Sequence, residues 1–117
     1  MPARAGAPRQ RTPSPELFEV VARHFRVLGE PARLDLLHAL AEGEQTAASL
    51  MDRTGLSQAG LSKHMSVLCA AGFARRWREG TYVRYGLADE RILALCELMC
   101  DRIETAANRT FDLVASR

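Results

Sequence analysis

The fold is decided by residues 46–73, which read TAASLMDRTGLSQAGLSKHMSVLCAAGF. Two short helical patterns, over residues 47–54 and 57–71, flank a glycine. Each pattern places its apolar residues on one stripe, and these residues are Leu50, Met51, Leu61, Met65 and Leu68. Gly55 favours a tight turn between the helices, and Ser57 is a typical N-cap for the second one. The spacing predicts a helix-turn-helix whose second helix has a polar side free for a partner.

Two helices are predicted before this motif, over residues 15–28 and 31–41, and each begins at a proline. The second of them is expected to bury Leu34, Leu37, Leu40 and Ala41. Residues 44–46 form either a short strand or only the cap of the third helix.

After the motif, strands over residues 73–78 and 82–87 form a hairpin that turns at residues 79–80. A long helix over 89–114 follows, with a stripe of Ile92, Leu95, Met99, Ile103, Ala106 and Thr110. Four helices, a hairpin and a last helix predict a winged helix-turn-helix: a mostly α chain with a small β-hairpin wing, of class α+β.

The composition allows one domain and excludes a membrane span. The chain has 117 residues, 16 Lys and Arg, 14 Asp and Glu, and a net charge of +2. No apolar run approaches the roughly 18–20 residues of a span, and the N-terminal stretch lacks the apolar core of a secretory signal. An odd number of cysteines, three, indicates reduced thiols. We expect a cytoplasmic protein with a disordered basic arm over 1–15, one domain over 16–114 and a tail over 115–117.

Positive charge is concentrated around the predicted helix-turn-helix and hairpin. Residues 53–84 contain six basic residues and one acidic residue, a net charge of +5, and residues 1–15 contain three arginines and no acid. A basic hairpin beside a helix that fits the major groove is typical of a DNA-binding transcription regulator. An enzyme with a cysteine nucleophile is not favoured, because the three histidines, His24, His38 and His64, lie on helices already assigned to packing or to DNA binding.

A combination of motifs extends this interpretation. It consists of FRVLGEPARLDLL at 25–37, GLSQAGLSKHMSVL at 55–68, AGF at 71–73, and REG at 78–80 with Tyr85. Over about residues 17–105 the chain resembles the ArsR/SmtB family of small bacterial metal- and stress-responsive repressors. The resemblance implies a homodimer joined by the first and last helices, bound to an imperfect palindrome in operator DNA. It also implies release of that DNA when an effector binds.

By position, the recognition-helix side chains expected at the DNA are Ser57, Gln58, Ala59, Ser62, Lys63 and His64. Gln58 is the expected base reader, because a carboxamide can bond adenine through two hydrogen bonds. The hairpin is expected to add Arg75, Arg76, Arg78 and Arg84 at phosphates or in the minor groove. We interpret His64 as a structural or DNA-contacting residue rather than a metal ligand. Trp77 and Tyr82 are expected to pack across the hairpin.

The effector sites best known in the family are not matched. Their positions hold Thr46 and Ala48, Val67 and Ala71, or Arg91, Arg102 and Thr105, and only Asp89 of the zinc-type set is kept. The remaining candidates are Cys96 and Cys100, one helical turn apart, with Cys69 as a further thiol. A thiophilic metalloid or metal ion, such as trivalent arsenic or antimony, is one expected effector, and no cofactor is required. Two alternatives stay open: a redox or persulfide sensor, and cysteines that only pack.

Overall fold

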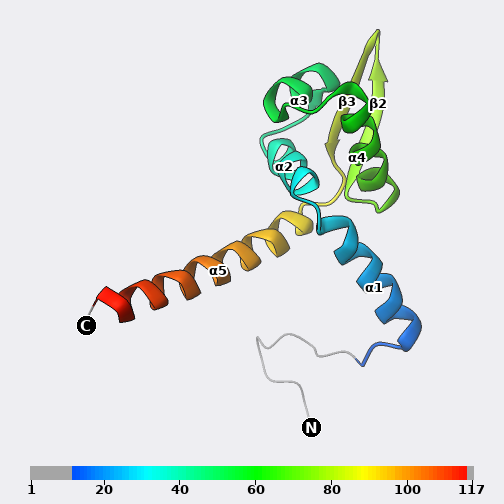
Figure 1. The fold of residues 1–117 in the computed structure, drawn as a ribbon. Helices are drawn as coiled ribbons and strands as arrows, with labels where there is room; N and C mark the ends of the chain where they lie inside the picture. The colour runs from blue at the N-terminus through cyan, green and yellow to red at the C-terminus, as the bar shows by residue number, and fades with distance from the viewer. Residues whose placement is uncertain (1–11, 116–117) are drawn as a thin grey trace.

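The computed structural model describes the backbone of residues 12–115 and the side chains of residues 12–110, and it has the predicted winged helix-turn-helix architecture (Figure 1). In chain order the elements are α1 (Pro15–Leu28), α2 (Pro31–Leu40), β1 (Gln45–Thr46), α3 (Ala47–Thr54), α4 (Gln58–Ala70), β2 (Ala74–Glu79), β3 (Tyr82–Leu87) and α5 (Arg91–Ala115). The helices α2, α3 and α4 gather around the sheet, while α1 and α5 project from this body in different directions. Within the described range no helix is long and apolar enough to cross a membrane. Most of the predicted basic arm, and residues 116–117 of the tail, lie outside that range.

Side-chain caps and one left-handed glycine set the helix-turn-helix. The Thr46 hydroxyl accepts a hydrogen bond from the Ser49 amide at 3.1 Å and starts α3, and the Ser57 hydroxyl accepts one from the Gly60 amide at 3.0 Å and starts α4. Between the two helices, Gly55 has φ of +75°, which residues with a Cβ rarely adopt. Each cap contributes about 1 kcal/mol, so the turn is encoded locally.

A three-stranded antiparallel sheet joins the wing to the helical body. Its strand order is β1-β3-β2. For residues 44–46 the sequence allows a strand or a cap, and the structure contains both. Gln45 pairs with Tyr85 and Thr46 pairs with Arg84, while the Thr46 side chain also caps α3.

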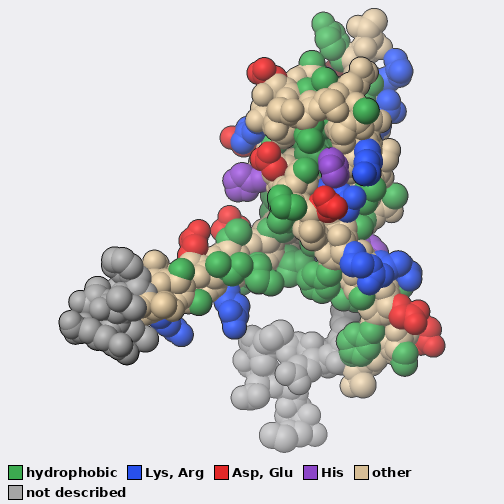
Figure 2. Space-filling model, in the orientation of Figure 1, with side chains coloured by type: hydrophobic (Ala, Val, Ile, Leu, Met, Phe, Trp, Pro, Cys, Tyr) green, Lys and Arg blue, Asp and Glu red, His purple; other side chains and the backbone are tan. Residues whose placement is uncertain are grey.

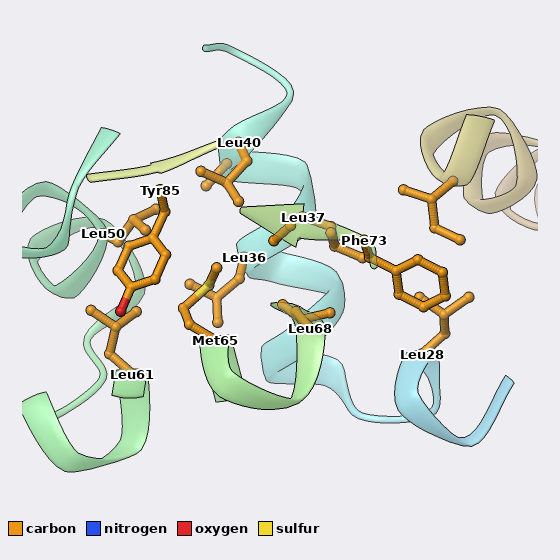
Figure 3. Close-up of a cluster of buried hydrophobic side chains, with 13 residues drawn as sticks. Leu28, Leu36, Leu37, Leu40, Leu50, Leu61, Met65, Leu68, Phe73 and Tyr85 are labelled. Atoms are coloured by element: carbon orange, nitrogen blue, oxygen red, sulfur yellow. The ribbon is translucent and has the colours of Figure 1, made fainter. Parts of the chain in front are cut away.

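The core lies between α2, α3, α4 and the sheet (Figure 3). Its main side chains are Leu36, Leu37, Leu40, Leu50, Leu61, Met65, Leu68, Phe73 and Tyr85. The stripe predicted for α4 is confirmed, since all three of its residues are buried. Burying one leucine contributes about 1.5–3 kcal/mol. The core therefore fixes α4 from one side and leaves the other side available.

The buried set predicted for α2 is partly wrong. Leu34 is 41% exposed and Ala41 is exposed, whereas Leu36 and Ala39 are fully buried. Leucines occur on several sides of this helix, so spacing alone does not select the buried face.

The predicted stripe of α5 is buried at only one end. Ile92 packs into the core cluster, but the rest of the stripe is exposed: Leu95, Met99, Ile103, Ala106 and Thr110. Leu95 borders a groove against α1, and further along α5 projects away from the helical body, where the described part of the chain supplies no element to cover it.

Candidate nucleic-acid interface

The outer side of α4 carries polar and small side chains near its N-terminus. Its exposed members are Ser57, Gln58, Ala59, Ser62 and Lys63, while His64 is half-buried on the flank. The Ser57 oxygen accepts one hydrogen bond in the helix cap, which leaves its O–H donor and a second lone pair for a partner. An exposed polar helix supported by a buried stripe matches the requirements for entering the major groove.

The four wing arginines predicted at the DNA lie on two different faces of the hairpin. Side chains alternate along a strand, and Arg76 is paired with the buried Tyr85. Arg76 and Arg78 therefore share the face that packs on the core and α4. Arg75 and Arg84 lie on the opposite face.

Arg75 is held by three partners at the base of the wing. Its terminal nitrogen donates to a Glu44 carboxylate oxygen at 2.8 Å, and its Nε donates to the Leu87 carbonyl at 3.3 Å. The guanidinium also lies 4.5 Å from the centroid of the Trp77 ring, a cation–π distance. A Cβ at Gly86 would approach that ring to 3.3 Å, so the absence of a side chain there makes room for the stack.

Arg84 is also paired with an acid, because it forms a salt bridge with Glu79 across the hairpin. Arg76 and Arg78 have no acidic partner among the side chains of residues 12–110. The wing thus presents two uncompensated arginines on the α4 side. Figure 2 shows basic side chains along one edge of the wing.

The two hairpin aromatics behave differently. The Trp77 ring lies against Gly86 of the facing strand, in line with the predicted packing across the hairpin, and it also stacks on Arg75 of its own strand. The prediction for Tyr82 is wrong: this side chain is 62% exposed and lies opposite Glu79 near the tip of the wing.

A contact between α2 and α4 has no signal in the sequence pattern. Arg33 donates from Nε to Nδ1 of His64 at 3.3 Å, and these residues are 31 positions apart. The same guanidinium donates to the Val27 carbonyl, also at 3.3 Å. Only the packing of α2 on α4 brings these groups together.

The cysteines occupy two separate places. Cys69 is half-buried near the end of α4; burial raises the pKa of its thiol, and Arg76 partly offsets this. Cys96 is half-buried and Cys100 is exposed on α5. Burial raises the pKa of Cys96, and the nearby Cys100 and Glu97 raise it further. Among the side chains of residues 12–110, no three His, Cys, Asp or Glu lie close enough to hold a metal ion, so Cys69 does not join the α5 pair within one chain.

Asp89 has a structural partner. Its carboxylate accepts hydrogen bonds from the Arg91 backbone amide at 3.0 Å and from a guanidinium nitrogen of the same residue at 2.7 Å. These bonds lower the pKa of Asp89 to about 2. The carboxylate therefore starts α5, and the position that matches a zinc ligand is already engaged.

Comparison with known proteins identifies the family. A family model described as "Bacterial regulatory protein, arsR family" matches residues 30–76, from the start of α2 into β2. A "Probable mercury resistance operon repressor" from Streptomyces lividans is 38% identical over 80 residues, which cover 68% of this chain and 64% of that protein. The HTH-type transcriptional regulator CmtR of Mycobacterium tuberculosis is also 38% identical over 80 residues, covering 68% of each chain.

A solved structure agrees with this assignment. The homodimeric winged helix-turn-helix DNA-binding domain of a possible ArsR-family regulator from Mycobacterium bovis superposes with a TM-score of 0.68. It is 31% identical, and the alignment covers 84% of this chain and 91% of that one. The fold comparison and the sequence comparisons therefore point to the same family. The chain belongs to the arsR family of bacterial regulatory proteins, as a winged helix-turn-helix, DNA-binding transcription regulator.

Proposed function

We propose that two copies of this chain form a repressor that binds an imperfect palindrome in operator DNA and releases it when a thiophilic ion binds Cys96 and Cys100. Trivalent arsenic or antimony is the expected class of effector. The observation that carries this proposal is that α5 bears both the cysteine pair and an apolar face that the described chain leaves uncovered.

The proposed dimer interface consists of α1 and α5. Phe18 on α1 is 57% exposed, and Leu98 and Ile103 on α5 are 69% and 58% exposed. Figure 2 shows hydrophobic side chains along α5 and where α1 meets it. A groove of about 340 Å³ opens at this junction, lined by Val20, Val21, His24, Phe25, Leu28, Phe73, Ile92 and Leu95. Soluble chains rarely leave such patches uncovered, and the Mycobacterium bovis relative is homodimeric. A second copy would cover both helices.

Twofold pairing would place two copies of α4 in successive major grooves, with half-site centres about 34 Å apart. Gln58 is the expected base reader, because it is exposed directly after the Ser57 cap. Arg76 and Arg78 are the expected phosphate ligands of the wing, because no acid in the described range neutralises them.

Effector binding is assigned to the α5 thiols. Cys96 and Cys100 are one turn apart, with Cβ atoms about 5–6 Å from each other. Met99 is three residues from Cys96, and Ile103 is three residues from Cys100, so the pair borders the proposed interface. Cys100 and Glu97 raise the pKa of Cys96 through their negative charge. The same negative charge would favour the binding of a cation at the pair. The partner copy or solvent would complete the coordination.

The redox alternative is less well supported within one chain. A disulfide requires Cβ atoms about 3.5–4.5 Å apart, which is closer than one helical turn allows. A bond between cysteines of two copies is still compatible with the sequence. The thiol chemistry proposed here also agrees with the relative named as a mercury resistance operon repressor.

The test is a titration of the protein–DNA complex, formed on the DNA upstream of the gene, with arsenite, antimonite, cadmium, zinc and a polysulfide. We expect arsenite or antimonite to release DNA from wild type and from Cys69→Ser, the matched control. Cys96→Ser and Cys100→Ser should keep their DNA. Release by the polysulfide alone would favour the redox alternative. If all three variants respond like wild type, the cysteines only pack and the thiol-sensor proposal is wrong.

A further inference from the structure

Arg33 connects three helices through one guanidinium group. The side chain starts on α2, donates from Nε to Nδ1 of His64 on α4, and donates from a terminal nitrogen to the Val27 carbonyl on α1, each at 3.3 Å. Both Arg33 and His64 are half-buried. A planar fork that bonds two fixed partners has a defined orientation.

The bond to His64 determines where that ring carries its hydrogen. A guanidinium has five N–H donors and no acceptor, so Nδ1 of His64 must contribute the lone pair. The ring hydrogen is then on Nε2. No hydrogen bond to Nε2 occurs among the described side chains and backbone of residues 12–110, so this N–H is available to an external acceptor.

We propose that Arg33 is a positioning residue for DNA recognition: it fixes His64 in the Nε2–H form and so makes it a hydrogen-bond donor toward the DNA. This inference rests on the proposed function, in which α4 enters the major groove. Phosphate oxygens and the major-groove acceptors of guanine, of thymine and of adenine N7 match such a donor, whereas the amino groups of adenine and cytosine do not.

The second bond extends this role to α1. Val27 lies in the last turn of that helix, where carbonyl groups lack helical donors and a cation is favourable. Since α1 is part of the proposed dimer interface, Arg33 ties an interface helix directly to a DNA-facing side chain. A displacement of α1 would reach His64 through two hydrogen bonds.

The first readout is the tautomer of each histidine ring, measured by two-bond ¹⁵N–¹H correlation spectra of the full chain. His24 is an internal reference, because its Nδ1 lies 2.8 Å from the Val20 carbonyl and must carry the hydrogen there. We expect His64 to show the opposite form, protonated on Nε2. Arg33→Met keeps the apolar stem and removes every donor, and should give His64 a mixture of both forms. Arg26→Met, at an exposed arginine on α1, should leave His64 unchanged.

The second readout is DNA affinity on a duplex selected by the wild-type protein from a random library. We expect Arg33→Met and His64→Ala each to weaken binding about tenfold, and the double variant to weaken it no further. Arg33→Lys keeps the charge but not the fork, and should behave like Arg33→Met. It also provides a folded variant if the methionine destabilises the chain, which circular dichroism would reveal.

Three results would overturn the inference. One is a His64 tautomer that is the same in Arg33→Met as in wild type. A second is an additive loss of DNA affinity in the double variant, because Arg33 would then act on DNA independently of His64. The third is wild-type affinity in His64→Ala while the protein still selects a duplex, which would leave the proposed function intact. A wild-type chain that selected no duplex would contradict both proposals.

Discussion

Replacing Arg78 with alanine is expected to change the salt dependence of DNA binding, and replacing Arg75 is not. Arg78 lies on the α4 side of the wing without an acidic partner in the described range. Arg75 lies on the other face, bonded to Glu44 and stacked on Trp77. Both variants remove one positive charge per subunit, but Arg75→Ala also breaks the bond to Glu44 and the stack on Trp77.

The magnitude follows from counterion release. Each phosphate contact contributes about 0.9 to the slope of log affinity against log salt, so Arg78→Ala should lower the slope of a dimer by about 1.8. Over a tenfold range of salt, the affinity gap between variant and wild type should change by about 60-fold.

Fluorescence anisotropy with a labelled duplex, from about 50 to about 500 mM KCl, measures these slopes directly. Arg75→Ala should reproduce the wild-type slope. Equal slope changes in the two variants would refute the division of the wing into a DNA-facing and a structural face.

Four further outcomes are expected. Gln58→Ala should relax the preference at one base pair of each half-site by about tenfold in selection from random duplexes; an unchanged preference would remove its base-reading role. Leu68→Ala, at a fully buried core position, should lower the free energy of unfolding by about 2–5 kcal/mol in urea titrations, and a loss below about 1 kcal/mol would contradict the packing. Ile103→Asp should give a monomer in analytical ultracentrifugation, whereas a persistent dimer would place the interface elsewhere. Because the pKa of Cys96 is raised, cadmium must displace the thiol proton throughout the neutral pH range. Calorimetry should therefore show cadmium affinity that rises with pH, up to about tenfold per pH unit for each displaced proton, and levels off above the raised pKa. A cadmium affinity that does not change with pH would exclude thiolate ligation.

The helix-turn-helix could be predicted from the sequence because its signals are local. Ser57 and Thr46 cap the helices that follow them, and Gly55 has the left-handed conformation expected of a turn glycine. Leu61 and Leu68 fall on one stripe because α4 packs on the core with a single side.

Other features depend on groups that are distant along the chain. The pairing of Arg75 with an acid depends on Glu44, which reaches this arginine because β1 pairs with β3. The Arg33–His64 bond likewise depends on how two helices pack. The α5 pattern predicts a buried stripe, but within the described residues of one chain only Ile92 has a covering surface.

Strand β1 ties the base of the wing to the helical body. Its two residues pair with β3 and continue directly into α3, which sets the separation between the base of the wing and the helix-turn-helix. A duplex whose groove width does not suit that separation has to deform before both can bind. We therefore expect operators with identical contacted bases but different stiffness in the intervening steps to differ in affinity. The mechanical properties of the DNA, together with its base sequence, would then decide which sites this regulator occupies.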